Sequence, residues 1–93
     1  MGIRIIVHDP DNWPQKNLFG DIVYERGDKM RVRLSEQIKG DKITSDLLEL
    51  QLIEKNQTFK PLHQYYSLMV SGSLIDKASN SSEYIITGTV TFD

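Results

Sequence analysis

One short cluster in this sequence has the side chains of a metal or acid–base site. His8, Asp9 and Asp11 bring an imidazole and two carboxylates together just after an apolar segment. A metal site needs three or more converging ligands, and the sequence identifies no others for this cluster. Aspartate next to proline or asparagine is also ordinary turn chemistry. We therefore predict a turn here, with no metal ion and no cofactor.

A row of basic residues is the strongest indication of a binding site. Lys29, Arg31 and Arg33 alternate along the segment 29–38, so in a strand all three project from one face. Basic residues beside aromatic side chains are typical of small barrels that bind single-stranded nucleic acid. The row therefore indicates an oligonucleotide-binding barrel as one candidate function.

The neighbouring segment supplies opposite charge to this row. A hairpin that turns around Gly27 pairs the segment 18–25 with 29–38. It places Asp21 opposite Arg33 and Glu25 opposite Lys29, and such cross-strand pairs favour one register. The row is then partly neutralised, so we favour a solvated face over a nucleic-acid site.

A repeated pattern places two glycines inside predicted strands. The segments 70–74 and 86–90 both read apolar, hydroxyl, glycine, hydroxyl, apolar, with a polar stretch between them. A hairpin symmetric about Asn80 would put Gly72 opposite Gly88 and leave bare backbone for a ligand or a partner strand. Alternatively the glycines let the strands bend, or leave room for an aromatic ring such as that of Tyr66. Glycine within a strand usually marks a bend, which we favour.

Trp13 is the only tryptophan and lies in the polar segment 9–17. A tryptophan exposed on a loop is a favoured anchor of protein interfaces. The same side chain would serve equally well as a lid that closes one end of a small barrel. Both interpretations of Trp13 stay open at this point.

These residues lie on or between six segments that alternate apolar and polar side chains with period two. The segments are 3–7, 18–25, 29–38, 43–55, 62–75 and 84–92. The segment 43–55 is the only candidate helix, but its leucines 48, 50 and 52 alternate as in a strand. Without a helix to cover a sheet, the strands must bury their apolar face against one another. We predict an all-β fold, a small antiparallel β-barrel of about six strands, with a two-layer β-sandwich as the alternative.

Composition fits one ordinary globular domain spanning residues 1–93. The chain has no cysteine and a net charge of −2, which excludes disulfides and thiolate sites and gives no long-range field toward nucleic acid or acidic lipid. Its longest wholly apolar runs are three residues, too short to span a membrane, and no signal peptide is evident. We therefore expect a cytoplasmic protein with no membrane partner.

No pattern for nucleophilic catalysis or phosphate binding is present, so we expect a protein that is not an enzyme. The favoured function is a protein-binding or structural module within a larger assembly. Its partner, or a second copy, would add to an unpaired edge strand, for which 3–7 and 62–75 are the candidates. The alternative is a single-stranded nucleic-acid-binding module that uses the basic row.

Overall fold

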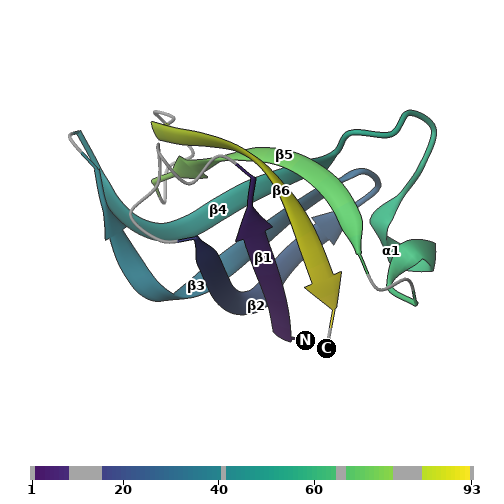
Figure 1. The fold of residues 1–93 in the computed structure, drawn as a ribbon, viewed down its shortest axis with the longest axis horizontal. Coiled ribbons are helices and arrows are strands. Elements are labelled where there is room, and N and C mark those ends of the chain that lie inside the picture. Colours follow the sequence, from purple (N-terminus) through teal and green to yellow (C-terminus); the bar gives the residue numbers. More distant parts are fainter. Residues whose placement is uncertain (1, 9–15, 41, 65–66, 77–82, 93) are drawn as a thin grey trace.

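The computed structural model describes residues 2–8, 16–40, 42–64, 67–76 and 83–92, which form six strands and one short helix. In chain order these are β1 (Gly2–Val7), β2 (Asn17–Arg26), β3 (Lys29–Lys39), β4 (Thr44–Leu52), α1 (Phe59–Leu62), β5 (Leu68–Ile75) and β6 (Glu83–Phe92) (Figure 1). Each strand is antiparallel to the next, and β1 also pairs with β6. The predicted six-stranded antiparallel barrel is confirmed, and no sandwich forms.

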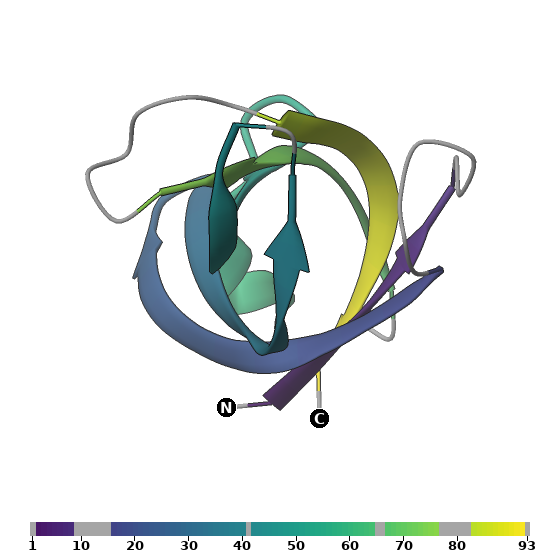
Figure 2. The same ribbon diagram turned by 90° about the vertical axis from the view of Figure 1, so that its left-hand side faces the viewer.

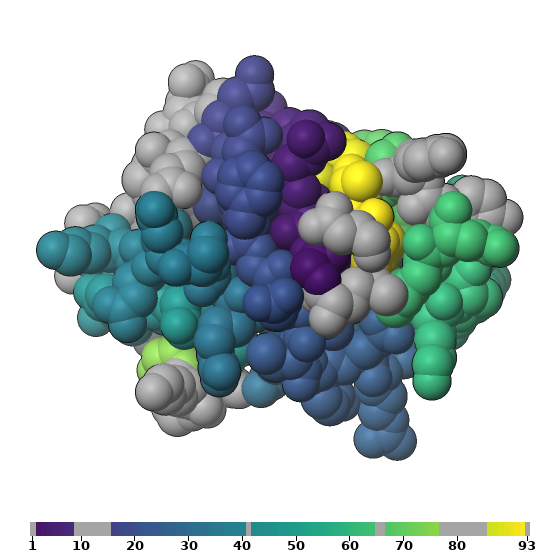
Figure 3. Space-filling model, turned by 90° about the horizontal axis from the view of Figure 1, so that it is seen from below, coloured from purple at the N-terminus to yellow at the C-terminus, as the bar shows by residue number. Residues whose placement is uncertain are grey.

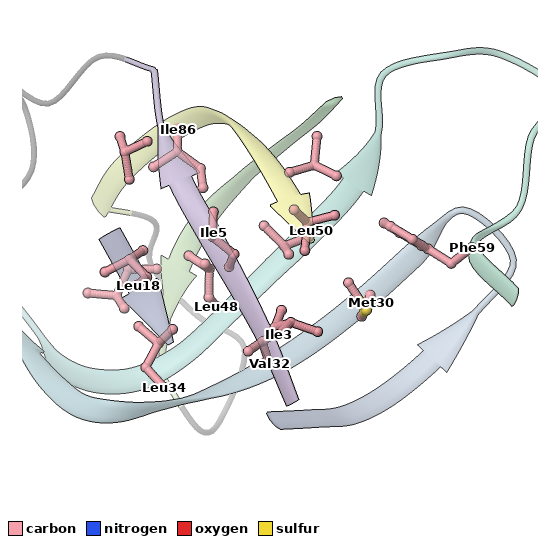
Figure 4. Close-up of a cluster of buried hydrophobic side chains, with 14 of the residues drawn as sticks. Ile3, Ile5, Leu18, Met30, Val32, Leu34, Leu48, Leu50, Phe59 and Ile86 are labelled. Carbon is pink, nitrogen blue, oxygen red and sulfur yellow. The ribbon is translucent and has the colours of Figure 1, made fainter. Parts of the chain in front are cut away.

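The inward-facing side chains of all six strands form one hydrophobic core. The alternation seen in the sequence puts every second residue inside, as with Ile3, Ile5 and Val7 of β1. Removing this apolar surface from water is the main force that holds the barrel closed. Figure 4 shows Ile5, Leu48 and Leu50 meeting in the middle of this core.

A bulge in β3 bends the tip of the β3–β4 hairpin over one end of the barrel. Arg33 pairs with Leu47 and Ile38 with Ser45, so residues 34–37 of β3 lie opposite residue 46 alone. Extra residues on one strand of a pair bend that strand. Viewed along the barrel, the tip lies across the open end, and Ile38 is buried there (Figure 2).

The helix α1 closes the opposite end. Phe59 is fully buried and meets Phe92 edge to face, with 6.5 Å between ring centroids. Its backbone N–H donates to the carbonyl of Gly27 in the β2–β3 turn, at 2.8 Å. The predicted strand 62–75 is thus wrong in its first part, because α1 occupies its start and β5 begins at Leu68.

The predicted β2–β3 register is confirmed in its first half only. Asp21 lies opposite Arg33 as expected, but the register shifts between Ile22 and Tyr24. Beyond this bulge Glu25 pairs with Met30 instead of Lys29. The connecting turn is the two residues 27–28, one shorter than predicted.

The predicted pairing of Gly72 with Gly88 is wrong by two residues. Gly72 lies opposite Ile86, and Gly88 lies opposite Val70. A shift of two residues keeps every side chain on its original face, so hydrophobic alternation cannot distinguish the two registers. The predicted inward positions of β6 were therefore correct although its partners were not.

The glycines of β5 and β6 sit where neighbouring strands approach closely. A Cβ on Gly72 would meet the carbonyl oxygen of Glu49 on β4 far inside van der Waals contact. A Cβ on Gly88 would lie 2.8 Å from the carbonyl oxygen of Ile6 on β1. Both positions are thus sites of tight strand coiling in the closed barrel.

Closure also overturns the expectation of an unpaired edge strand. The N-terminal strand β1 has β2 and β6 as neighbours, and β5 has β4 and β6. A closed barrel has no outer strand whose whole length is available for pairing. Neither edge candidate, 3–7 nor 62–75, can therefore recruit a partner along its full length.

The close approach at Gly72 predicts a large cost for a single methyl group. We expect Gly72→Ala to lower the free energy of unfolding by at least about 3 kcal/mol, because the clash is with backbone. Gly27→Ala is the control: Gly27 has φ +63° but open space around it, so only left-handed backbone strain of about 1–2 kcal/mol applies. Urea denaturation measures both, and equal losses would contradict the packing role of Gly72.

Phe59, which fills the α1 end of the barrel, predicts a second difference in stability between two variants. Phe59→Ala should cost about 3–5 kcal/mol of unfolding free energy, because it empties a fully buried site. Phe19→Ala removes the same ring from a side chain that is 54% exposed and should cost less than about 0.5 kcal/mol. Thermal and urea unfolding of the two variants test this. A Phe59→Ala variant as stable as Phe19→Ala would contradict the role of Phe59 in stabilising the α1 end of the barrel.

Candidate binding surface

The outer face of β2 carries most of the large apolar surface that the barrel leaves exposed. Among the described residues, five large hydrophobic side chains are exposed, and three lie on β2: Phe19, Val23 and Tyr24. Figure 3 looks onto this face, where β2 (indigo to blue) lies between β1 and the teal tip of the β3–β4 hairpin. Aromatic residues concentrated on one face are characteristic of binding surfaces.

The β2 bulge is what turns Tyr24 outward. In regular alternation from Leu18, which is buried, Tyr24 would point into the core. The register shift after Ile22 inserts Val23 as an extra residue, and both Val23 and Tyr24 are 47% exposed. The bulge thus exchanges one core position for two adjacent apolar side chains on the surface.

The exposed side chains of Phe19, Val23 and Tyr24 form what we call the aromatic strip. Arg31 lies next to this strip and contacts one residue of β2 and one of β4. Its Nε donates to Oε2 of Glu49 on β4 at 3.0 Å, and its guanidinium lies 5.8 Å from the ring centroid of Tyr24. A cation over an aromatic face is stabilised by the ring quadrupole. The two contacts fix a half-buried guanidinium beside an exposed ring, a pair of residue types that anchors many interfaces.

The other two members of the basic row are less constrained. Lys29 and Arg33 are exposed, and neither forms an ion pair with any residue that the structure describes. Arg33 nevertheless lies opposite Asp21 on β2, as predicted from the sequence. The outer face of β2 and β3 therefore combines apolar, positive and negative side chains without a single dominant sign of charge.

Several other predicted site residues fall outside the described residues or away from this face. Trp13, Tyr66, Asp9 and Asp11 are not among the described residues. His8 is exposed, and its Nε2 lies 2.6 Å from the hydroxyl of Thr89. Within the described ranges no group of three His, Asp or Glu side chains could hold a metal ion.

Gly72 and Gly88 lie away from the aromatic strip and do not expose a strip of bare backbone. The space above each is filled by the neighbouring strand, and Gly88 is buried. This packing favours a role in bending the strands over a role in ligand binding.

A polar cluster at the α1 end was missed in the sequence. His63 Nε2 lies 2.6 Å from Oε2 of Glu25, and both side chains are largely buried. The His63 ring also stacks on Phe92 at 4.4 Å between centroids. The signal that could have revealed a helix here was Pro61 three residues after Thr58, because the first turn of a helix tolerates proline, whose missing N–H needs no partner there. The cluster ties α1 to β2 and β6.

Two of the clefts on the described surface lie next to exposed hydrophobic side chains. One, of about 240 Å³, lies between residues 17–19 of β2 and residues 34–36 and 38 of β3. The other, of about 380 Å³, is mainly apolar and lies between the end of β4, α1 and the start of β5. Phe19 lines the first cleft, so that cleft is continuous with the aromatic strip of β2.

Comparison with known proteins adds no assignment. No protein-family model, curated protein or solved structure matches this chain. Within the described residues, no helix has the length and apolar character needed to cross a membrane. The functional conclusion must therefore come from the geometry of the chain itself.

The Glu25–His63 contact predicts an energetic coupling that can be measured directly. In a double-mutant cycle with Glu25→Ala and His63→Ala, we expect a coupling energy of about 1–2 kcal/mol, because the pair is largely shielded from water. The matched cycle on the exposed pair His8 and Thr89 should give less than about 0.5 kcal/mol. The same coupling energy in both cycles would contradict a structural role for the Glu25–His63 pair.

Proposed function

We propose that this protein is a non-catalytic protein-binding module whose docking face is the outer face of β2 together with Arg31 and Arg33 of β3. The observation that carries the proposal is the concentration of exposed hydrophobic side chains on β2. These side chains lie outside the core of the barrel, so the packing of the core does not explain why they are exposed on β2. Covering them with a partner would remove that apolar area from water.

The chemistry of the face fits a protein partner. Tyr24 and Arg31 belong to the residue types that contribute most to protein interfaces, and their mutual stacking reduces the entropy lost on binding. Phe19 supplies a second aromatic anchor next to a cleft. Asp21 and Arg33 provide polar groups of both signs around these anchors, as an interface rim requires.

Single-stranded nucleic acid is the second candidate ligand for the same face. The exposed Lys29 and Arg33, with Tyr24 as a stacking platform, are the features that favour it. Glu49 neutralises Arg31, and Asp21 lies opposite Arg33, so phosphates would meet carboxylates along the row. Together with the net charge of −2, this arrangement favours protein over nucleic acid.

The protein-binding proposal can be tested by site-specific crosslinking followed by affinity measurement. A photoreactive phenylalanine analogue at Phe19 should crosslink a partner protein in the host cell, which mass spectrometry then identifies. With that partner purified, Phe19→Ala and Tyr24→Ala should each weaken binding at least about tenfold in calorimetry, as truncated anchors do.

Met69 provides a matched control for this experiment. It is 55% exposed, against 54% for Phe19, but lies on β5 beside the other cleft. Met69→Ala should leave the affinity unchanged, and the photoreactive analogue at Met69 should not capture the same partner. Equal effects at Phe19 and Met69 would overturn the proposed face.

The nucleic-acid alternative predicts its own measurement. We expect a fluorescent twelve-residue oligothymidine to bind with a Kd weaker than ~100 μM at physiological salt. Tighter binding that falls steeply as salt rises, and that is lost in the Arg31→Ala, Arg33→Ala double variant, would favour nucleic acid instead. Tight binding unaffected by the double variant would exclude the basic row as its site.

A further inference from the structure

The cleft of about 380 Å³ beside α1 lies apart from the proposed docking face, on strands that do not adjoin β2. The register of β4 and β5 runs as far as Leu52 with Val70, and the Ile53 N–H donates to the carbonyl of Met69 at 3.4 Å. Beyond this point the chain leaves β4 toward α1, which lies at the same end of the barrel as the start of β5 (Figure 1). The cleft is thus located where β4 and β5 part.

Apolar side chains of two kinds form most of the described lining of this cleft. Leu52, Leu62 and Leu68 belong to the hydrophobic core or pack against it. Ile53 and Met69 are 47% and 55% exposed, and they are the two exposed large hydrophobic residues that the structure describes outside β2. A concave and mainly apolar site of this volume is typical of sites for small molecules. A small apolar molecule bound here would cover both exposed side chains.

Contacts with the barrel hold the α1 side of the cleft in place. Phe59, the first residue of α1, is fully buried, and its N–H donates to the carbonyl of Gly27. His63, which follows the lining residue Leu62, contacts Glu25 and stacks on Phe92. A site that is already formed loses less conformational entropy when its ligand binds.

Glu54 gives the cleft its charge. It is the only charged residue among the described lining residues, it is exposed, and it forms no ion pair with any residue that the structure describes. Glu54 also lines a neighbouring cleft of about 270 Å³, which shares Leu62, Ser67 and Leu68 with the first. Lys55 comes next in the sequence but lines neither cleft. A carboxylate beside an apolar cleft attracts a cation and repels an anion.

We propose that this cleft binds a small amine with an apolar body. The apolar body lies against the three leucines, and the ammonium group lies at the Glu54 carboxylate, with the Ser67 hydroxyl as a second acceptor. A neutral molecule would leave the carboxylate without a partner, and an anion would be repelled by it. This inference goes beyond the proposed docking face, because it assigns a second site with a ligand of different chemistry.

Three probes with the same apolar body test the proposal: phenylbutylamine, phenylbutanol and phenylbutyrate. In NMR titrations of the full chain labelled with nitrogen-15, we expect the amine to bind with a Kd of about 1 mM or tighter. The largest shifts should occur at the amides of residues 52–54 and 67–69. The neutral alcohol should bind about threefold more weakly than the amine, and the carboxylate at least about fivefold more weakly, as one exposed charge pair allows.

Two variants test the two halves of the site. Glu54→Gln should weaken the amine about threefold, to the affinity of the alcohol, and should leave the alcohol unchanged. Met69→Ala should weaken the amine and the alcohol alike, by about threefold, because it removes apolar contact. Phe19→Ala is the matched control, since Phe19 is 54% exposed but lies on the docking face. It should leave the affinity of all three probes unchanged.

Four results would overturn the amine site. These are the absence of saturable shifts, equal affinities for the amine and the carboxylate, an amine affinity unaffected by Glu54→Gln, and shifts centred on Phe19 and Tyr24. The last result would place the amine on the docking face. The docking face is tested at Phe19 and Tyr24 and the amine site at Glu54 and Met69, so either proposal can fail while the other stands.

Discussion

The close approach of neighbouring strands is the constraint on which the rest of this barrel depends. A sheet of only six strands closes on itself only if its strands coil tightly. Gly20, Gly72 and Gly88 each sit where a Cβ would collide with a backbone carbonyl of the adjacent strand. They lie at the β2–β3, β4–β5 and β6–β1 contacts, every second seam around the barrel. Closure therefore depends on these three glycines as well as on the hydrophobic pattern.

Closure in turn restricts where a partner can bind. With every strand paired on both sides over its central part, the surface offers side chains in place of free backbone. Two bulges interrupt the regular register, one in β2 next to Val23 and one in β3 over residues 34–37. The first turns Tyr24 outward, and the second bends the tip of the β3–β4 hairpin over one end of the barrel. Both irregularities border Phe19 or its strand, so they converge on one region of the molecule.

The sequence predicted what depends on local alternation and missed what depends on register. The inward positions of β1, β3 and β4 were correct because period-two patterns identify a buried face directly. The Gly72–Gly88 pairing failed because a two-residue slip preserves that pattern. Alternation along β2 would place Tyr24 inside, yet Tyr24 is exposed. The reason is related, because a bulge inverts the alternation and has no sequence signal of its own. Within the candidate site, Arg31 and Arg33 were therefore predictable as surface residues, whereas Phe19 and Tyr24 were not predicted as part of the same surface.

The separation of core and surface roles predicts that the proposed face can be altered without loss of the fold. Phe59 packs against Phe92 at the α1 end, and the His63 ring, paired with Glu25, stacks on Phe92, so these residues contribute to stability. Phe19 and Tyr24 lie on the outside of β2, and only Tyr24 has a described ring or cation contact, to Arg31. Loss of either ring leaves the strand pairing intact, because the ladders are formed by backbone groups. The proposed partner would cover exposed hydrophobic side chains of β2 that lie outside the core of the barrel.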